Sequence, residues 1–366
     1  MGIHLTIPTG FLAVPGTNAT GNYGIGDQIT GLDWVIKNIQ YFGGDPNQIT
    51  IAGQSAGAGS VRALLGSPKA IGKFQGALAE SNLGGGVALG LSGTYSTTYS
   101  SYLTITGSFY QSGGNALFTQ AGCGNVTGQA GVDCLINYSG ALNTLPNQPR
   151  YVVQDGAIVN TPELEVATKN NQVAHVPVIF GNAANDGASI GSSYSKTCAN
   201  ETACLVADLG ISEYWAENII ASGLFPSPNT GNVTADAFNV SQRVSTDLGF
   251  LCVDQATVYA GTISGAFPAA WYYSSQVGYF EDAYNPNGVN IQGTIEPGYP
   301  LGNPATPYYV VHSADLGSFF GTVSNLRGPS DLYAIQNTLD LWGSFVRTGN
   351  PNPSVPMLKL RQYTKT

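Results

Sequence analysis

Apolar positions in the first part of the chain switch between helical and strand spacing. The segment DQITGLDWVIKNI at 27–39 has apolar residues at i, i+3, i+4 and i+7 from Leu32, which predicts a helix with one apolar face. The β-branched run QITIA at 48–52 predicts a strand. A second helix is expected over AGAGSVRALL at 56–65, and a second strand over GALAE at 76–80. This alternation is typical of a parallel α/β sheet.

The second half of the chain repeats both kinds of pattern. HVPVIFG at 175–181 predicts a buried strand, and PYYVVH at 307–312 predicts another. Helices are expected over EYWAENIIAS at 213–222 and over SDLYAIQNTLDLWGSFVRTG at 330–349. Between the strand at 76–80 and the strand at 175–181, residues of about 82–150 are rich in Gly, Ser, Thr and Tyr. This composition indicates an insertion over the sheet rather than a separate domain.

Composition limits the classes of partner. An apolar content of 43% over 366 residues is enough for a large core. Only 10% of residues are charged, and the net charge is −9 with a pI near 4.6. Such a chain lacks the positive field that attracts phosphate backbones, so we expect no nucleic-acid partner. No apolar run has the length that spans a bilayer.

Cysteines and sequons favour a secreted protein. None of the five cysteines forms a C-x-x-C pair, so we expect no metal site, and their grouping fits two short-loop disulfides and one thiol. They are Cys123, Cys134, Cys198, Cys204 and Cys252. The six glycosylation sequons are at Asn18, Asn125, Asn137, Asn200, Asn232 and Asn239. The N-terminus MGIHLTIPTGFLAVPG is nevertheless no signal peptide, because it lacks a basic region and a long apolar core.

One serine lies where a nucleophile is expected. In ITIAGQSAGAGSV at 49–61, Ser55 stands between the predicted strand and helix, with Gly53 and Gly57 two residues away on either side. A strand-to-helix turn exposes a hydroxyl, and small flanking residues relieve the crowding of that turn. The alternative is a glycine-rich turn without chemistry, in a chain that has 48 glycines. The strand before and the helix after favour a nucleophile elbow.

A nucleophilic serine needs a base to take its proton. The chain has three histidines. His4 precedes the serine, and His175 comes before a strand and ahead of any downstream acid, where a structural role is the better interpretation. His312 ends the predicted strand 307–312 and alone leaves room for the chain order serine, acid, histidine of an α/β-hydrolase.

The acid is less determined by the sequence. Asp186 follows the predicted strand 175–181, within the stretch Asn-Asp-Gly. That stretch is also a common turn, so a purely structural role is the alternative. Asp155, Glu163 and Asp315 are competing acids, and spacing alone does not choose among the four.

Several blocks of the chain resemble the type-B carboxylesterase/lipase family, which includes cholinesterases and secreted fungal lipases, and most closely the fungal members. The densest match is GNYGIGDQITGLDWVIKNIQYFGGDPNQITIAGQSAGAGSV at 21–61. Shorter matches are ALAES at 77–81, VPVIFGNAANDG at 176–187, VHSADLGSFFG at 311–321 and WGSFVRTGNPN at 342–352. Together they run from Gly10 to about Asn352.

The resemblance implies a single α/β-hydrolase domain over 1–366, with a mostly parallel sheet, helices on both faces and a cap-like insertion. It implies hydrolysis of small-molecule or lipid esters without a cofactor. Carried over by motif, Ser55 is the nucleophile, His312 the base and Asp186 the acid, where the family usually has glutamate. The remaining implied roles are oxyanion donor for the Ala56 N–H, triad support for Ser81, structural acid for Asp315 and a disulfide for Cys123–Cys134.

The chain also departs from the family pattern. No His-Gly-Gly-Gly-type oxyanion loop precedes Ser55, and Gly84-Gly85-Gly86 lies downstream as loop. The family's first strands, first disulfide and signal peptide would precede residue 1. We therefore expect a truncated chain, cut at the N-terminus and also at the C-terminus, with impaired activity. The alternative is a catalytically inactive, cholinesterase-like binding module. We expect the substrate pockets at the insertion and near Leu83, Phe319 and Phe320.

Overall fold

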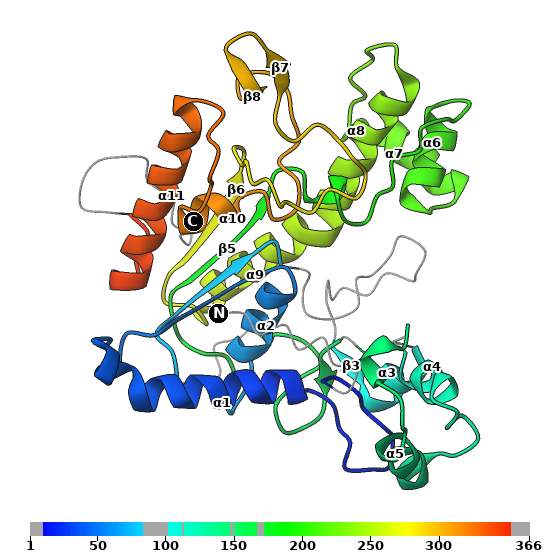
Figure 1. Ribbon diagram of the computed structural model, residues 1–366, viewed down its shortest axis with the longest axis vertical. Helices are drawn as coiled ribbons and strands as arrows, with labels where there is room; N and C mark the ends of the chain where they lie inside the picture. Colours follow the sequence, from blue (N-terminus) through cyan, green and yellow to red (C-terminus); the bar gives the residue numbers. More distant parts are fainter. Residues whose placement is uncertain are drawn as a thin grey trace.

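Four parallel strands form the central sheet of the protein. The computed structural model describes residues 10–82, 102–111, 113–146, 149, 151–166 and 172–352. The strands lie in the order β1-β2-β5-β6 (Figure 1). Their bounds are β1 (Thr50–Gln54), β2 (Gly76–Glu80), β5 (Val178–Ala183) and β6 (Ala270–Ser275).

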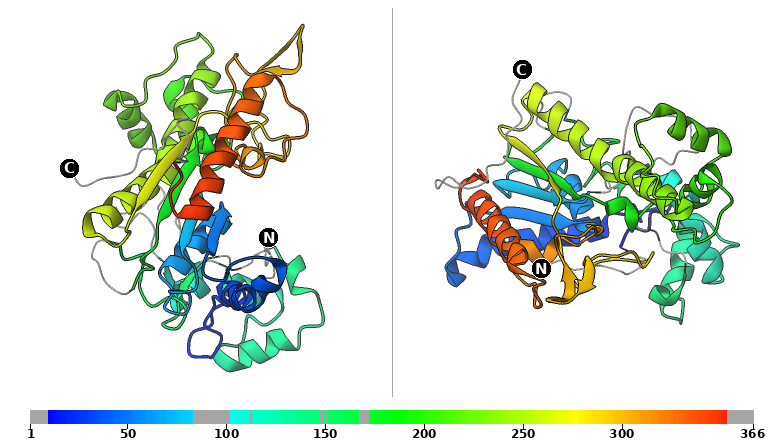
Figure 2. Two further views of the ribbon diagram at one scale, coloured as in Figure 1. Left: turned by 90° about the vertical axis from the view of Figure 1, so that its left-hand side faces the viewer. Right: turned by 90° about the horizontal axis from the view of Figure 1, so that it is seen from above.

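Helices cover both faces of this sheet (Figure 2). Because side chains alternate along a strand, Phe180 and Ile179 of β5 enter different apolar clusters, one on each face. Helices α1 (Tyr23–Asn38), α2 (Ala56–Leu65) and α9 (Cys252–Ser264) contribute to the first cluster. Helices α10 (Leu316–Phe320) and α11 (Pro329–Thr348) contribute to the second. The predicted α/β class is confirmed.

The other elements lie around this core. The further helices are α3 (Ile105–Gln111), α4 (Gly114–Gln120), α5 (Gly128–Ile136), α6 (Glu201–Leu209), α7 (Glu213–Ser222) and α8 (Val233–Thr246). Single turns are the 3₁₀ helices η1 (Ile39–Phe42), η2 (Leu142–Thr144) and η3 (Asp186–Ala188), and the π-helical η4 (Asp247–Leu251). Two small sheets pair β3 (Leu103–Thr104) with β4 (Val153–Gln154), and β7 (Thr294–Glu296) with β8 (Tyr299–Asn303).

Most predicted elements are confirmed, and one is wrong. The helices at 56–65 and 213–222 and the strand at 76–80 have the predicted bounds. The segment 307–312 joins no sheet, because its backbone bonds go to loops. The Tyr309 N–H donates to the carbonyl of Asn290 at 2.8 Å.

The described part of the predicted insertion has its own apolar cluster. Helices α3, α4 and α5 pack around Phe118, together with Leu12 and Val14 of the N-terminal segment. This cluster includes no described residue of the four-stranded sheet. Figure 1 shows these helices beside the sheet, next to the N-terminal segment.

Two disulfides link near neighbours. Cys123 pairs with Cys134, as the resemblance implies, and Cys198 pairs with Cys204. Cys252 is a half-buried free thiol. Within the described ranges, no helix combines the length and apolar character needed to cross a membrane.

Phe180 tests the central core. Its side chain is 0% exposed in the middle of the sheet, so Phe180→Ala leaves a cavity, and we expect a loss of about 3–5 kcal/mol in the free energy of unfolding. Phe42→Ala is the matched control, since Phe42 is 72% exposed and its loss should stay within about 0.5 kcal/mol. Urea denaturation measures both. Equal losses in the two variants would contradict this assignment of the core.

Candidate active site

Ser55 occupies a strained turn between β1 and α2. Its φ of 57° and ψ of −121° lie where residues other than glycine are rare. The Ser55 N–H donates to the carbonyl of Glu80 at 2.9 Å, and its carbonyl accepts from the Gly59 N–H at 3.0 Å. The backbone on both sides therefore holds the serine at the carboxyl end of the sheet.

Only one of the two flanking glycines is required by this turn. A Cβ on Gly53 would overlap the carbonyl of Gly57 and lie 2.9 Å from the nitrogen of Ala58. A Cβ on Gly57 would meet no described atom within 4 Å. The expectation that small residues are needed on both sides therefore holds at Gly53 alone.

Asp186 and His312 form a buried pair. His312 Nδ1 lies 2.6 Å from Asp186 Oδ1, and the two side chains are 4% and 0% exposed. The other carboxylate oxygen of Asp186 accepts from Ser81 Oγ at 2.9 Å and from the Ala183 N–H at 3.0 Å. Three donors on one buried carboxylate are the condition under which it can stay charged away from water.

Asn185 ties the loop of Asp186 to the segment that carries His312. Its N–H donates to the carbonyl of Val310 at 3.0 Å, and its Oδ1 accepts from the Val310 N–H at 2.9 Å. Ser189 Oγ accepts from the His312 N–H at 3.3 Å. Sequence reasoning did not single out Asn185, because Asn-Asp-Gly has the composition of an ordinary turn.

Ser55 does not complete the chain of hydrogen bonds in this structure. The nearest partner of His312 Nε2 is the carboxamide nitrogen of Gln54, at 3.1 Å. No hydrogen bond of Ser55 Oγ is found among the described residues. The Ala56 N–H belongs to the first turn of α2, whose amides have no partner inside the helix. The structure thus brings Asp186, Ser81 and His312 together, with Ser55 adjacent to Gln54.

The competing histidines and acids are engaged elsewhere. His175 is exposed, and its Nδ1 lies 2.9 Å from the carbonyl of Ala266. Asp155 Oδ1 accepts three backbone N–H groups of its own turn. Glu163 makes no contact with His312 among the described hydrogen bonds and ion pairs. His4, Leu83 and Gly84–Gly86 lie outside the described residues.

Two further buried carboxyls lie beside the pair. Burial raises the pKa of Glu80 well above its usual value, and the nearby Asp315 raises it further. Burial, and then Asp186, raise the pKa of Asp315 from 3.8 to about 7. One oxygen of each has no partner among the described residues, and the hydroxyl of Tyr273 donates to Asp315 Oδ2 at 3.4 Å. Glu80 was also missed, although it is the one charged residue of the strand GALAE.

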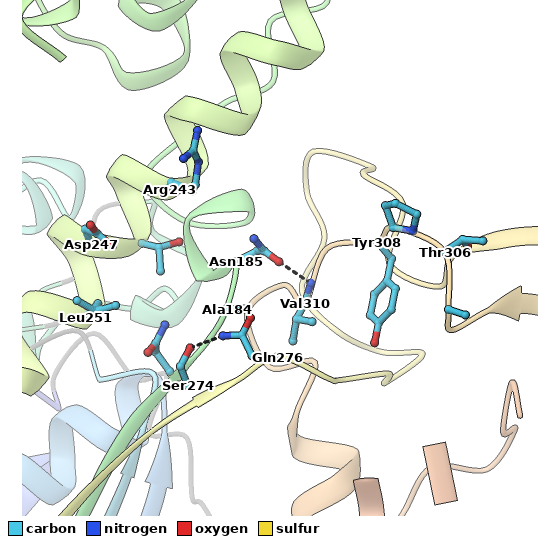
Figure 3. Close-up of a pocket in the computed structure, with 14 residues that line it drawn as sticks. Ala184, Asn185, Arg243, Asp247, Leu251, Ser274, Gln276, Thr306, Tyr308 and Val310 are labelled. Atoms are coloured by element: carbon cyan, nitrogen blue, oxygen red, sulfur yellow. Dashed lines mark hydrogen bonds between the residues drawn. The ribbon is translucent and has the colours of Figure 1, made fainter. Parts of the chain in front are cut away.

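A cavity of about 560 Å³ lies beside the loop of Asp186, where Ala184 and Asn185 line it (Figure 3). Ser55 is not among its lining residues. Arg243 and Asp247 of α8 and η4 line one side, and Tyr308 lines the other. Phe319 and Phe320, which were expected near the substrate pockets, do not line this cavity. Phe319 is buried and stacks on Trp342 at 4.8 Å, so it belongs to the core, and Phe320 is exposed.

The sequons differ in exposure. Asn239 is half-buried, and the other five are exposed, namely Asn18, Asn125, Asn137, Asn200 and Asn232. Asn200 and Asn232 cap α6 and α8 through their side-chain oxygens. No group of three His, Cys, Asp or Glu residues that could hold a metal ion occurs in the described ranges.

Asp315 gives a pH-dependent stability prediction. Because its pKa is about 7 in the folded protein against 3.8 in a free side chain, folding retains a proton that the unfolded chain loses between these values, and stability falls as the pH rises from about 4 to 7. Asp315→Asn removes this loss. The free energy of unfolding of Asp315→Asn, measured relative to that of the unsubstituted protein, should therefore increase by a few kcal/mol from pH 5 to pH 8, at about 1.4 kcal/mol per pKa unit. Urea denaturation at both pH values measures the gain, and a constant difference would contradict it.

Comparison with known proteins places the chain in a family. The model of the Carboxylesterase family matches residues 7–366. Human Cocaine esterase is 49% identical over 80 residues, which are 22% of this chain and 14% of that protein. Juvenile hormone esterase of Tribolium castaneum is 51% identical over 72 residues, 20% of this chain and 12% of that protein. Human Neuroligin-2 is 50% identical over 72 residues, 20% and 9% of the two chains. The matches thus span at most 14% of these three relatives. Since the family model matches nearly the whole chain, this protein belongs to the carboxylesterase family.

Proposed function

We propose that this protein hydrolyses carboxylic esters through an acyl-enzyme formed on Ser55. The observation that supports this most is the buried Asp186–His312 pair, whose Nε2 faces the residue next to the elbow serine. The esterase relatives support the same reaction class.

The proposed reaction uses groups at the carboxyl edge of the sheet. His312 Nε2 takes the proton of Ser55 Oγ as the oxygen attacks the ester carbonyl, and the carbonyl electrons move to its oxygen. The Ala56 N–H donates to that oxyanion. The protonated imidazole, stabilised by Asp186, then gives its proton to the departing alcohol, and water releases the acid by the same route.

We propose small-molecule or lipid esters as substrates and secretion as the location. Exposure of five of the six sequons is consistent with a glycoprotein. Two disulfides fit an oxidising compartment. Neither observation selects the acyl or alcohol group of the substrate.

Replacement of the serine tests the mechanism. Ser55→Ala should reduce hydrolysis of p-nitrophenyl acetate to the background reaction, at least roughly 10³-fold, because no nucleophile remains. Ser60→Ala on the same helix is the control and should retain activity. A fluorophosphonate probe should label Ser55 alone, as read by peptide mass spectrometry. Unchanged turnover in Ser55→Ala, or labelling of another residue, would refute the proposal.

We also propose that the 366-residue chain is a slow catalyst. Its sequence has no His-Gly-Gly-Gly-type loop before Ser55, so Ala56 supplies one oxyanion donor without the loop that would supply others. Loss of one such donor costs roughly 10²–10³ in rate. A version with this loop added upstream should hydrolyse p-nitrophenyl acetate faster by at least that factor. Equal rates for the two proteins would contradict the proposal.

A second candidate function is that of a binding module without catalysis. It is favoured by one observation, namely that Gln54 rather than Ser55 contacts His312 Nε2. The two functions are distinguished by the fluorophosphonate probe, because a binding module leaves Ser55 unlabelled.

A further inference from the structure

The carboxamide of Gln54 occupies the nitrogen that a nucleophilic serine would need. Gln54 is the last residue of β1 and directly precedes Ser55. Its amide nitrogen lies 3.1 Å from His312 Nε2. On the other side of the ring, Nδ1 lies 2.6 Å from Asp186 Oδ1. An ionised carboxylate only accepts hydrogen bonds, so Nδ1 carries the proton and Nε2 accepts from Gln54.

While Gln54 donates to His312 Nε2, Ser55 cannot donate to the same nitrogen. A neutral imidazole has a single acceptor nitrogen with one lone pair in the ring plane. Ser55 Oγ has no hydrogen bond in the described part of the chain, although its backbone is fixed by Glu80 and Gly59. Gln54 and Ser55 therefore compete for one acceptor on His312.

We propose that Gln54 is a positioning residue that holds His312 Nε2 in the resting enzyme and must release it before Ser55 can be deprotonated. This inference rests on the proposed ester hydrolysis. A carboxamide suits this role because its NH₂ group donates to a neutral ring, whereas a carboxylate has no proton to donate. Gln54 is half-buried and therefore partly accessible to solvent, and we expect its side chain to turn away when a substrate enters.

Two variants of Gln54 and one control test the inference. Gln54→Leu keeps the bulk and removes the donor, and Gln54→Asn keeps the donor on a side chain one methylene too short to reach. In the control Gln28→Leu, the lost amide donates to Ser60 Oγ at 3.0 Å on α2 and does not contact His312. Circular dichroism and thermal unfolding verify that each variant folds.

The direct measurement is ¹⁵N NMR of labelled histidine. We expect the Nε2 resonance of His312 to move downfield, toward that of an unbonded imine nitrogen, in both Gln54 variants and to stay in place in Gln28→Leu. The second measurement is the rate constant for labelling of Ser55 by a fluorophosphonate. It should rise about fivefold to tenfold in both Gln54 variants, which corresponds to the net worth of one neutral hydrogen bond.

The outcomes separate this inference from the proposed function. An unchanged Nε2 resonance in Gln54→Leu overturns the inference, whatever the labelling rate. Labelling at the rate of the unchanged chain, or slower, also overturns it, since no competition is then relieved. If no variant is labelled at Ser55 while the resonance moves as expected, the proposed function fails, and the inference about its regulation fails with it.

Discussion

The parallel pairing of β1, β2 and β5 is the constraint on which the candidate site depends. In register, Gln54 lies opposite Glu80, and Glu80 lies opposite Gly181. The ladder continues one residue beyond the strands, because the Ser55 N–H donates to Glu80 and the Ser81 N–H donates to Gly181. Parallel strands end at one edge of a sheet, so groups far apart in the sequence emerge there together.

The three carboxyl groups at that edge differ in the hydrogen bonds that they accept. Asp186 receives bonds from His312, Ser81 and Ala183, which offset the cost of burying its charge. Glu80 and Asp315 each keep an oxygen without a described partner, and burial raises the pKa of both. Donors thus stabilise the carboxylate of Asp186 beside His312, while burial disfavours ionisation of Glu80 and Asp315.

Sequence patterns predicted the helices and strands whose bounds are determined by local sequence. The strand GALAE and the helix at 56–65 have the predicted bounds, because local periodicity and a following Gly-Ser-Pro stop are sufficient there. The apolar segment 307–312 has strand composition, but its partners are loops that no local pattern specifies. The contact of Gln54 with His312 was missed for the same reason, since it joins residues 258 positions apart. Proximity of this kind depends on the register of the sheet and on the loop that carries Asp186.

The side chain of Gln54 is held less firmly than that of the histidine. β1 is the edge strand of the described sheet, and its residues are half-buried or exposed, whereas every residue of β2 and β5 is buried. His312 is fixed by Asp186, by Ser189 and by the ring of Phe250 at 5.4 Å. A half-buried side chain turns more readily than a buried one with three contacts. Rotation of the Gln54 side chain, rather than movement of His312, therefore decides whether Gln54 or Ser55 faces Nε2.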